Sequence, residues 1–509
     1  MITATQEGTY NLSADSSSRQ AALSRGAVMA VVLMIGYCAL VSVLVVGLLW
    51  MAYADTVRPD AAPGRILLWV VATALVLWMV LPQADGFDPL GARILPEDEP
   101  ALFAVIERVA RQTGQPMPAE VYLVNDVGAS AAWRGGIAGF GSRRVLLLGL
   151  PLMDAVSVQE LEGILAHEFG HCQGGTVVLG PWILRTRTAI ASSMPLQRSA
   201  AASVFAWFGS LFLRATRDVS RRQELVADEV AVRLAGSATM ISALRTVHTR
   251  SMAYRTYMQQ ELQPVLELGY LPPVGAGFRR FLDAPGTSAY VGAVLQYEEA
   301  LGEPDPLDAH PSLKDRITAL EHLPQQSAGD TRRASSLLSD VIRWEHFIFG
   351  AIDSSGSWGL QPLEWDQVAD AVYLPLWRAR ADSHGHLLRG DTIGTLPTTS
   401  DHFVALGAKI PGRGKDASNE RACLDRAGHL ILAAIAVRLA EDGWSVTALP
   451  GDETILRRNG HELRPYSELR AVLDGRVPAS RWRERCAELG ISSVPLWGAA
   501  GSAHDGTNG

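Results

Sequence analysis

The sequence predicts a mainly helical α+β protein, with an N-terminal transmembrane helical hairpin, a central domain with a small sheet, and a small C-terminal α+β accessory domain. Two long runs without charged residues near the start of the chain predict the hairpin. Amphipathic helical patterns alternate with short apolar runs in the middle, and a hairpin-turn signal separates two short strand patterns near the end. At 509 residues, the chain is long enough for several domains.

The composition limits the class of protein. Hydrophobic residues make up 48% of the chain and charged residues only 19%, against about 25% charged residues in soluble domains. The net charge of −8 argues against a nucleic-acid partner, because such binding depends on cationic contacts with phosphates. The cysteines are too far apart in sequence for a disulfide scaffold or a thiolate metal cluster. They are Cys38, Cys172, Cys423 and Cys486.

Two uncharged runs predict a membrane hairpin at residues 27–83. Residues 27–52 contain no charged side chain, and 26 residues of helix are long enough for a hydrocarbon core of about 30 Å. Residues 66–82 form a second, shorter run of 17. The alternative is a cleaved signal peptide, but its apolar region is only about 7–15 residues long. We expect the polar residues 1–26 to be disordered, and the lipid bilayer to be a partner of this chain.

The arginines around the hairpin predict its orientation. Arg19 and Arg25 precede the first run and Arg93 follows the second, whereas the connecting loop contains Arg58 and Arg65. Because basic residues concentrate on the cytoplasmic side, we expect both ends of the hairpin to lie inside. The predicted location is a multi-pass protein of the cell (inner) membrane with most of the chain in the cytoplasm.

The start of the central domain predicts a small sheet between helices. A helical pattern covers residues 97–111, and strand patterns follow at 121–124 and 145–150. Ser157 and Glu160 then form a capping-box pattern, in which the two side chains bind free backbone N–H groups at a helix start. The predicted helix extends to about Gln173. The face of the first helix that we expect to be buried consists of Leu102, Val105, Ile106 and Val109.

This capped helix contains the sequence His167-Glu168-Phe169-Gly170-His171. Two histidines four residues apart lie on one helix face, where two neutral imidazoles can bind one zinc ion. Glu168 projects beside them, close enough to accept a proton from a reacting water without being a ligand. The alternative is a pair of partly buried helix histidines that bind no metal.

A catalytic zinc site needs a third protein ligand. In one large class this ligand is a histidine six residues after the second, but that position holds Val177. Glu224 is the candidate on a later helix, and Asp228 lies on the same face one turn further. Asp228 is expected to accept the outer N–H of a ligating histidine. The alternative is a solvated acidic face paired with Arg221 and Arg222.

This order of motifs resembles the HtpX-like and CaaX-type membrane zinc metallopeptidases over residues 95–322. The Glu162–Ala166 segment resembles the helix that leads into the family's zinc motif. Asn125 resembles the start of the substrate-binding edge strand, although residues 126–128 differ from the family's pattern. The resemblance implies a zincin-like domain of the gluzincin type. A substrate would then lie extended along an edge strand near residues 129–134, adding a strand to the sheet.

The same resemblance extends to a late element that begins His310-Pro311 and includes Arg316. It implies that His310 and Arg316 face the active site and steady the scissile carbonyl and its oxyanion. Taken without the resemblance, His310 is a residue at a helix start and Arg316 is a surface cation.

The region between the predicted zinc ligands contains a hydrophobic insert at residues 174–214. Its uncharged runs, 174–184 and 199–213, are both shorter than the 17 residues needed for a clean span. We expect membrane-embedded or interfacial helices beside the site. The alternative is a buried cytosolic helix pair.

A polar linker at residues 323–335 is expected to separate the peptidase domain from an accessory domain of unknown function at 336–497. This domain is a possible site for a protein partner. His384 and His386 are expected in a loop without metal, and residues 498–509 as a disordered tail. The elements predicted in the accessory domain are a helix at 429–442, a strand at 444–449, a hairpin turn at Asn459-Gly460, and helices at 467–473 and 479–489.

The sequence therefore predicts a membrane-anchored zinc metalloendopeptidase that hydrolyses protein or peptide substrates. One Zn²⁺ per chain would be held by His167, His171 and Glu224, with Glu168 as the general base. Quality control of membrane proteins is one expected role. Two alternatives stay open: a CaaX-type processing protease, and a non-catalytic membrane scaffold or sensor with a structural zinc.

Overall fold

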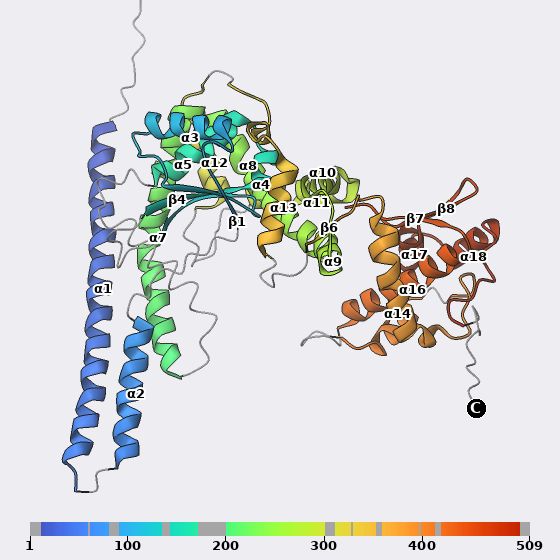
Figure 1. The fold of residues 1–509 in the computed structure, drawn as a ribbon, viewed down its shortest axis with the longest axis horizontal. Helices are drawn as coiled ribbons and strands as arrows, with labels where there is room; N and C mark the ends of the chain where they lie inside the picture. Colours follow the sequence, from blue (N-terminus) through green and yellow to red (C-terminus); the bar gives the residue numbers. More distant parts are fainter. Residues whose placement is uncertain are drawn as a thin grey trace, which may run out of the picture. The chain divides into compact units, whose positions relative to one another are not determined.

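The structure is a computed structural model that describes residues 12–59, 62–80, 91–134, 143–171, 200–300, 311–326, 329–352, 359–396, 399–412 and 419–498. Helices predominate and three small sheets accompany them in these ranges, so the predicted mainly helical α+β class is confirmed (Figure 1). The chain divides into two compact units. Unit 1 is Met1–Ser251 with Ala293–Ile352, and unit 2 is Met252–Gly292 with Asp353–Gly509.

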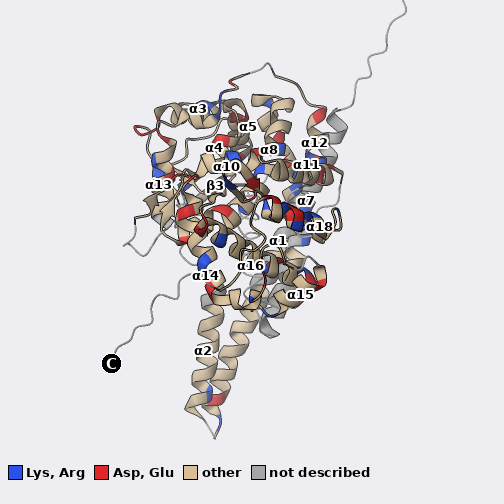
Figure 2. Cartoon of the chain, turned by 90° about the vertical axis from the view of Figure 1, so that its right-hand side faces the viewer, with Lys and Arg blue, Asp and Glu red and all other residues tan. Residues whose placement is uncertain are grey.

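Unit 1 begins with two long helices, α1 (Leu12–Val57) and α2 (Pro63–Val80). The buried Asp55 holds the turn between them, because its carboxylate accepts hydrogen bonds from Trp69 Nε1 at 3.0 Å and Arg65 Nε at 3.2 Å. α2 contains one charged residue, Arg65, close to this turn, and Figure 2 shows charged residues at this end of the helix pair. Residues 12–26 were expected to be disordered, but they form the first turns of α1.

Many large apolar side chains of α1 and α2 are exposed, among them Val43, Leu49, Leu68 and Leu75. Within the ranges that the structure describes, no helix is at once long enough and apolar enough to cross a membrane. The membrane hairpin at 27–83 therefore stays a prediction.

A four-stranded sheet lies at the centre of unit 1, in the order β1-β2-β4-β3. β2 and β4 are parallel, whereas β1 and β3 run antiparallel to their neighbours. β3 therefore lies at an edge, and its bounds coincide with the expected edge strand at 129–134. The strands are β1 (Gly91–Ile94), β2 (Glu120–Val124), β3 (Ala129–Arg134) and β4 (Arg143–Gly149).

Local signals fix the helices beside this sheet: α3 (Pro100–Gln112), the short α4 (Leu150–Ala155) and α5 (Val158–Gly170). All four residues of the predicted buried face of α3 are buried. The capping box at the start of α5 is confirmed, since Ser157 and Glu160 bind each other's backbone N–H groups. The predicted end of this helix at Gln173 lies outside the described residues, which stop at His171.

α7 (Ala200–Ala235) is one continuous helix that packs against α5 (Figure 1). Residues 174–199 of the predicted insert lie outside the described part, and residues 200–214 form the first turns of α7. A side chain at Gly170 would meet the backbone of Ala227 at 2.9 Å, so only glycine permits this close approach. The contact brings the end of α5 next to the C-terminal half of α7.

The remaining helices of unit 1 are α8 (Ser237–Tyr257) and α11 (Pro285–Ala300), each of which has residues in both units, α12 (Leu313–Glu321), the short 3₁₀ turn η3 (Ala334–Leu337), and α13 (Val341–Ile352). The units do not divide at the predicted linker 323–335. Val158 N–H donates to Arg332 O at 2.8 Å, and the buried Glu99 accepts from Trp344 Nε1 on α13 at 2.5 Å. These long-range bonds attach the polar stretch and α13 to unit 1.

Unit 2 includes residues 252–292, which the sequence analysis assigned to the central domain. Their aromatic side chains explain the difference. Trp365 packs on Tyr257 and donates from Nε1 to Pro273 O at 2.9 Å. The elements here are η2 (Met258–Leu262), α9 (Gln263–Glu267), β5 (Tyr270–Leu271), α10 (Val274–Asp283), β6 (Gln361–Pro362), η4 (Ala369–Tyr373), α14 (Leu374–His384), η5 (Gly385–Leu388) and α15 (Ser400–Ala408).

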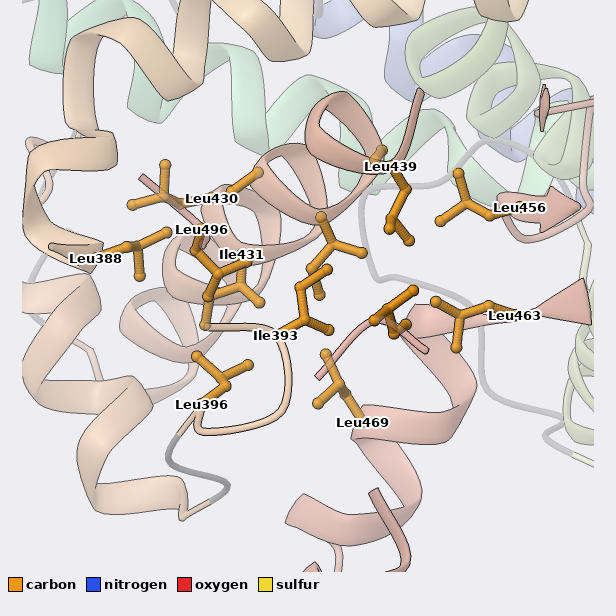
Figure 3. Close-up of a cluster of buried hydrophobic side chains, with 14 of the residues drawn as sticks. Leu388, Ile393, Leu396, Leu430, Ile431, Leu439, Leu456, Leu463, Leu469 and Leu496 are labelled. Atoms are coloured by element: carbon orange, nitrogen blue, oxygen red, sulfur yellow. The ribbon is translucent and has the colours of Figure 1, made fainter. Parts of the chain in front are cut away.

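The core of unit 2 surrounds α16 (Glu420–Glu441), whose Leu430, Ile431 and Leu439 meet apolar side chains from the neighbouring elements (Figure 3). The helix begins nine residues before the predicted start at 429, because the side chain of Asn419 caps it. The other elements are β7 (Ser445–Thr447), β8 (Ile455–Arg458), β9 (His461–Leu463), α17 (Pro465–Leu473) and α18 (Ala479–Glu488).

Two smaller predictions for unit 2 have opposite outcomes. The hairpin turn is confirmed: Asn459 and Gly460 join β8 to β9, with φ values of 51° and 80°. The expected loop around His384 and His386 is wrong, because His384 ends α14 and His386 lies in η5. The predicted tail after residue 498 lies outside the described residues.

Candidate metal centre

The three predicted zinc ligands come together between α5 and α7. His167 Nε2 lies 3.1 Å from His171 Nε2, and both atoms lie 3.5 Å from carboxylate oxygens of Glu224. Among the residues that the structure describes, no other set of three His, Cys, Asp or Glu side chains converges in this way. Glu224 thus meets two histidines that precede it by 57 and 53 positions in the sequence.

The spacing of these donor atoms fits a zinc ion. Zinc is bound tetrahedrally by His nitrogen and carboxylate oxygen at about 2.0–2.1 Å, so two of its ligand atoms lie about 3.3–3.4 Å apart. The two histidine nitrogens lie 3.1 Å apart, and each lies 3.5 Å from a different oxygen of Glu224, Oε2 for His167 and Oε1 for His171. With one ligand atom from each residue, the set converges within 4.8 Å. Two imidazoles and one carboxylate also leave a fourth position open, as catalytic zinc sites require.

The burial of His167 and the negative charge of the carboxylates around it favour a cation at this centre. His167 and Glu224 are each only 7% exposed. Burial alone would lower the pKa of His167, but the Asp228 and Glu224 carboxylates raise it to about 9. A cation is therefore favoured between these groups, and a metal ion would replace the imidazole proton.

Asp228 lies behind His167, on the side away from Glu224. Its Oδ1 is 2.9 Å from His167 Nδ1. Arg316, on α12, donates to the same carboxylate from Nε at 2.8 Å and from Nη2 at 2.6 Å. Burial would raise the pKa of Asp228, but the hydrogen bonds from Arg316 and the adjacent His167 ring lower it. The carboxyl group is therefore ionised at neutral pH.

Glu168 lies between the centre and the edge strand. Its Oε2 accepts a hydrogen bond from Ala131 N–H of β3 at 3.1 Å. Burial raises the pKa of Glu168, which makes its carboxylate a better proton acceptor than a solvated one. Since Ala131 N–H points to Glu168 and not to its β4 neighbour Leu146, the open edge of β3 faces the site.

The structure brings six of the seven predicted site residues together: His167, Glu168, His171, Glu224, Asp228 and Arg316. The seventh, His310, lies outside the described residues. The guanidinium of Arg316 is not free, since it contacts Asp228 and lies 3.9 Å from Glu224. The alternative of a solvated acidic face for Glu224 and Asp228 is wrong, because both are buried.

Two features of the site were not anticipated. Asn125 follows β2 and precedes β3, so it lies before the edge strand and not on it. Ala131 supplies the backbone contact to Glu168. An alanine has no side-chain chemistry, so only the register of β3 against β4 could have identified it.

Comparison with known proteins gives matches to the central part of the chain. Residues 96–324 match the model of Peptidase family M48. Three similar curated proteins are each named Protease HtpX homolog. That of Limosilactobacillus reuteri is 29% identical over 176 residues, which cover 30% of this chain and 58% of the relative. That of Acaryochloris marina is 26% identical over 230 residues, 41% of this chain and 75% of the relative.

The third, from Tropheryma whipplei, is 29% identical over 215 residues, 38% of this chain and 70% of the relative. This chain therefore spans little more than half the length of the Limosilactobacillus protein. No solved structure matches. All three alignments cover less than half of this chain.

Proposed function

The resemblance to HtpX-like M48 metallopeptidases is confirmed over residues 96–324, and from this premise we propose that the chain is a zinc-dependent endopeptidase. The observation that carries the proposal is the convergence of His167, His171 and Glu224, whose ligand atoms lie within 4.8 Å of one another. The adjoining carboxylate of Glu168 supports a catalytic centre over a structural one, because a structural zinc needs no general base.

In this mechanism the bound metal, Glu168 and Asp228 have different roles. A bound zinc ion would polarise the scissile carbonyl and make water acidic enough to react near neutral pH. Glu168 accepts a proton from the attacking water at its carboxylate and delivers it to the amine that leaves. Asp228 keeps His167 in one tautomer and one orientation.

The open edge of β3 is the proposed binding site for the substrate. An extended peptide can add to an edge strand through main-chain hydrogen bonds, which accept almost any sequence. The hydrogen bond from Ala131 N–H to Glu168 supports this position, because a peptide on that edge would pass beside the general base. The natural substrates would be found by comparing protein N-termini between cells with the parent chain and cells with a Glu168→Gln variant.

We further propose that α1 and α2 anchor the protein in a membrane, with the four-stranded sheet and the metal centre of unit 1 in the cytoplasm. Their exposed apolar side chains support this, because such surfaces are costly in water. A reporter that is active only outside the cell membrane should be active when inserted after Val57 and silent when fused after residue 86. The reverse pattern would place the metal centre outside.

Metal removal tests the peptidase proposal directly. Cleavage of an unfolded protein by the purified full-length chain should stop after treatment with a chelator, because His167, His171 and Glu224 then hold no Lewis acid. It should return when about one equivalent of Zn²⁺ per chain is added. Cleavage that continues in the metal-free protein would contradict the proposal, and so would a protein that binds zinc but cleaves nothing under any condition.

A further inference from the structure

Arg316 holds Asp228 by both of its oxygens. Nε donates to Oδ2 at 2.8 Å and Nη2 donates to Oδ1 at 2.6 Å. Ser312 caps the start of α12 and so fixes the first turn, from which Arg316 projects. The Asp228 side chain has no exposed surface, and that of Arg316 is 15% exposed. A two-pronged contact of this kind sets the plane of the carboxylate as well as its position.

The carboxylate of Asp228 links Arg316 to His167, one of the three predicted metal ligands. Oδ1 of Asp228 accepts the hydrogen bond from Nη2 of Arg316 and also lies 2.9 Å from Nδ1 of His167. A carboxylate beside Nδ1 keeps the proton on that nitrogen, and the lone pair of Nε2 is then free for a metal ion. Nε2 is the atom of His167 that faces His171 and Glu224.

We propose that Arg316 is a positioning residue for zinc, which acts through Asp228 on His167, and not a donor to the oxyanion of the substrate. The proposal rests on the proposed function for the identity of the metal. Two nitrogens of the guanidinium bind Asp228, and the third, Nη1, lies 3.9 Å from Oε2 of Glu224. All three nitrogens therefore face carboxylates around the metal centre.

The sign of the effect on zinc affinity separates this role from a simple effect of charge. A cation near a metal site repels the metal, so its removal should strengthen zinc binding if charge alone acts. Loss of a residue that orients a ligand has the opposite effect, and typically weakens metal binding by about 10–100-fold.

The experiment measures zinc affinity of the purified full-length chain by competition with a chromophoric chelator. Arg316→Ala should bind zinc about 10–100-fold more weakly than the parent. Arg316→Lys should lose less, because an ammonium keeps the charge but cannot hold both oxygens in one plane. Arg332→Ala is the matched control: Arg332 makes the same two-pronged contact with Asp330, but its side chain is 68% exposed and lies outside the centre.

A second measurement tests whether the effect passes through Asp228. In an Asp228→Ala background, Arg316→Ala should weaken zinc binding little further, because the intermediate carboxylate is already absent. Equal and additive losses would mean that the two residues act independently. With Co²⁺ in place of zinc, the visible absorption of Arg316→Ala should differ from that of the parent, since His167 would turn.

Zinc binding by Arg316→Ala that equals or exceeds that of the parent would overturn the proposal. If kcat fell at the same time, the oxyanion role would stand instead. If Arg316→Ala does not fold, Arg316→Lys decides: zinc affinity equal to that of the parent would overturn the proposal. A parent chain that binds no zinc would contradict the proposed function itself, which is a separate outcome.

Discussion

Glu168→Gln is expected to abolish most peptide cleavage while the protein keeps its fold and its zinc. The amide has nearly the same shape, and its oxygen can still accept the hydrogen bond from Ala131 N–H. It cannot accept a proton from water, and general acid–base catalysis typically contributes about 10²–10⁴-fold to the rate. The measurement is the initial rate of cleavage of an unfolded protein, with zinc content determined on the same sample.

Glu162→Gln is the matched control for this prediction. Glu162 lies on the same helix and pairs with Arg108 at the surface, so the same chemical change is made outside the centre. Its cleavage rate should equal that of the parent. Equal rates for Glu168→Gln and the parent would show that Glu168 is not the base. Loss of zinc in Glu168→Gln would show that the residue supports the metal.

Glu224→Ala should reduce the zinc content from about one ion per chain to nearly none. Two imidazoles alone hold zinc weakly, and the carboxylate supplies the negative charge of the set. Glu224→Gln should give nearly the same result, because a neutral amide is a poor zinc ligand. This second variant is close in shape to glutamate, so it separates loss of the ligand from loss of packing.

Glu229→Ala is the control on the same helix, because Glu229 is exposed and lies outside the centre. Its zinc content should match that of the parent. Metal analysis of the folded proteins, after removal of unbound zinc, decides the matter. Full occupancy in both Glu224 variants would mean that another residue provides the third ligand.

The local parts of the fold could be predicted because their causes are local. Ser157 and Glu160 are three residues apart and cap the same helix turn. Asn459-Gly460 adopts positive φ values that few other pairs tolerate. His167 and His171 share a helix face whatever surrounds them. The edge strand at 129–134 was placed correctly by the family resemblance, and not by a strand pattern in the residues themselves.

The position of the third ligand depends on packing as well as on sequence. Glu224 and Asp228 follow a helical spacing, but the sequence alone allowed both to be solvated. The close approach at Gly170 and Ala227 turns this face of α7 toward the histidines and buries both carboxylates. A motif could suggest the ligand, and only the contact between two helices brings its oxygens within 3.5 Å of the imidazoles.

The sequence by itself therefore determined the type of chemistry, since His167, Glu168 and His171 are neighbours on one helix. The tertiary structure decided what Arg316 touches and where the units divide. Arg316 meets Asp228 from 88 positions away, and Trp365 meets Pro273 from 92. Neither pairing produces a periodic pattern in the sequence, because such contacts form only when separate elements pack against each other.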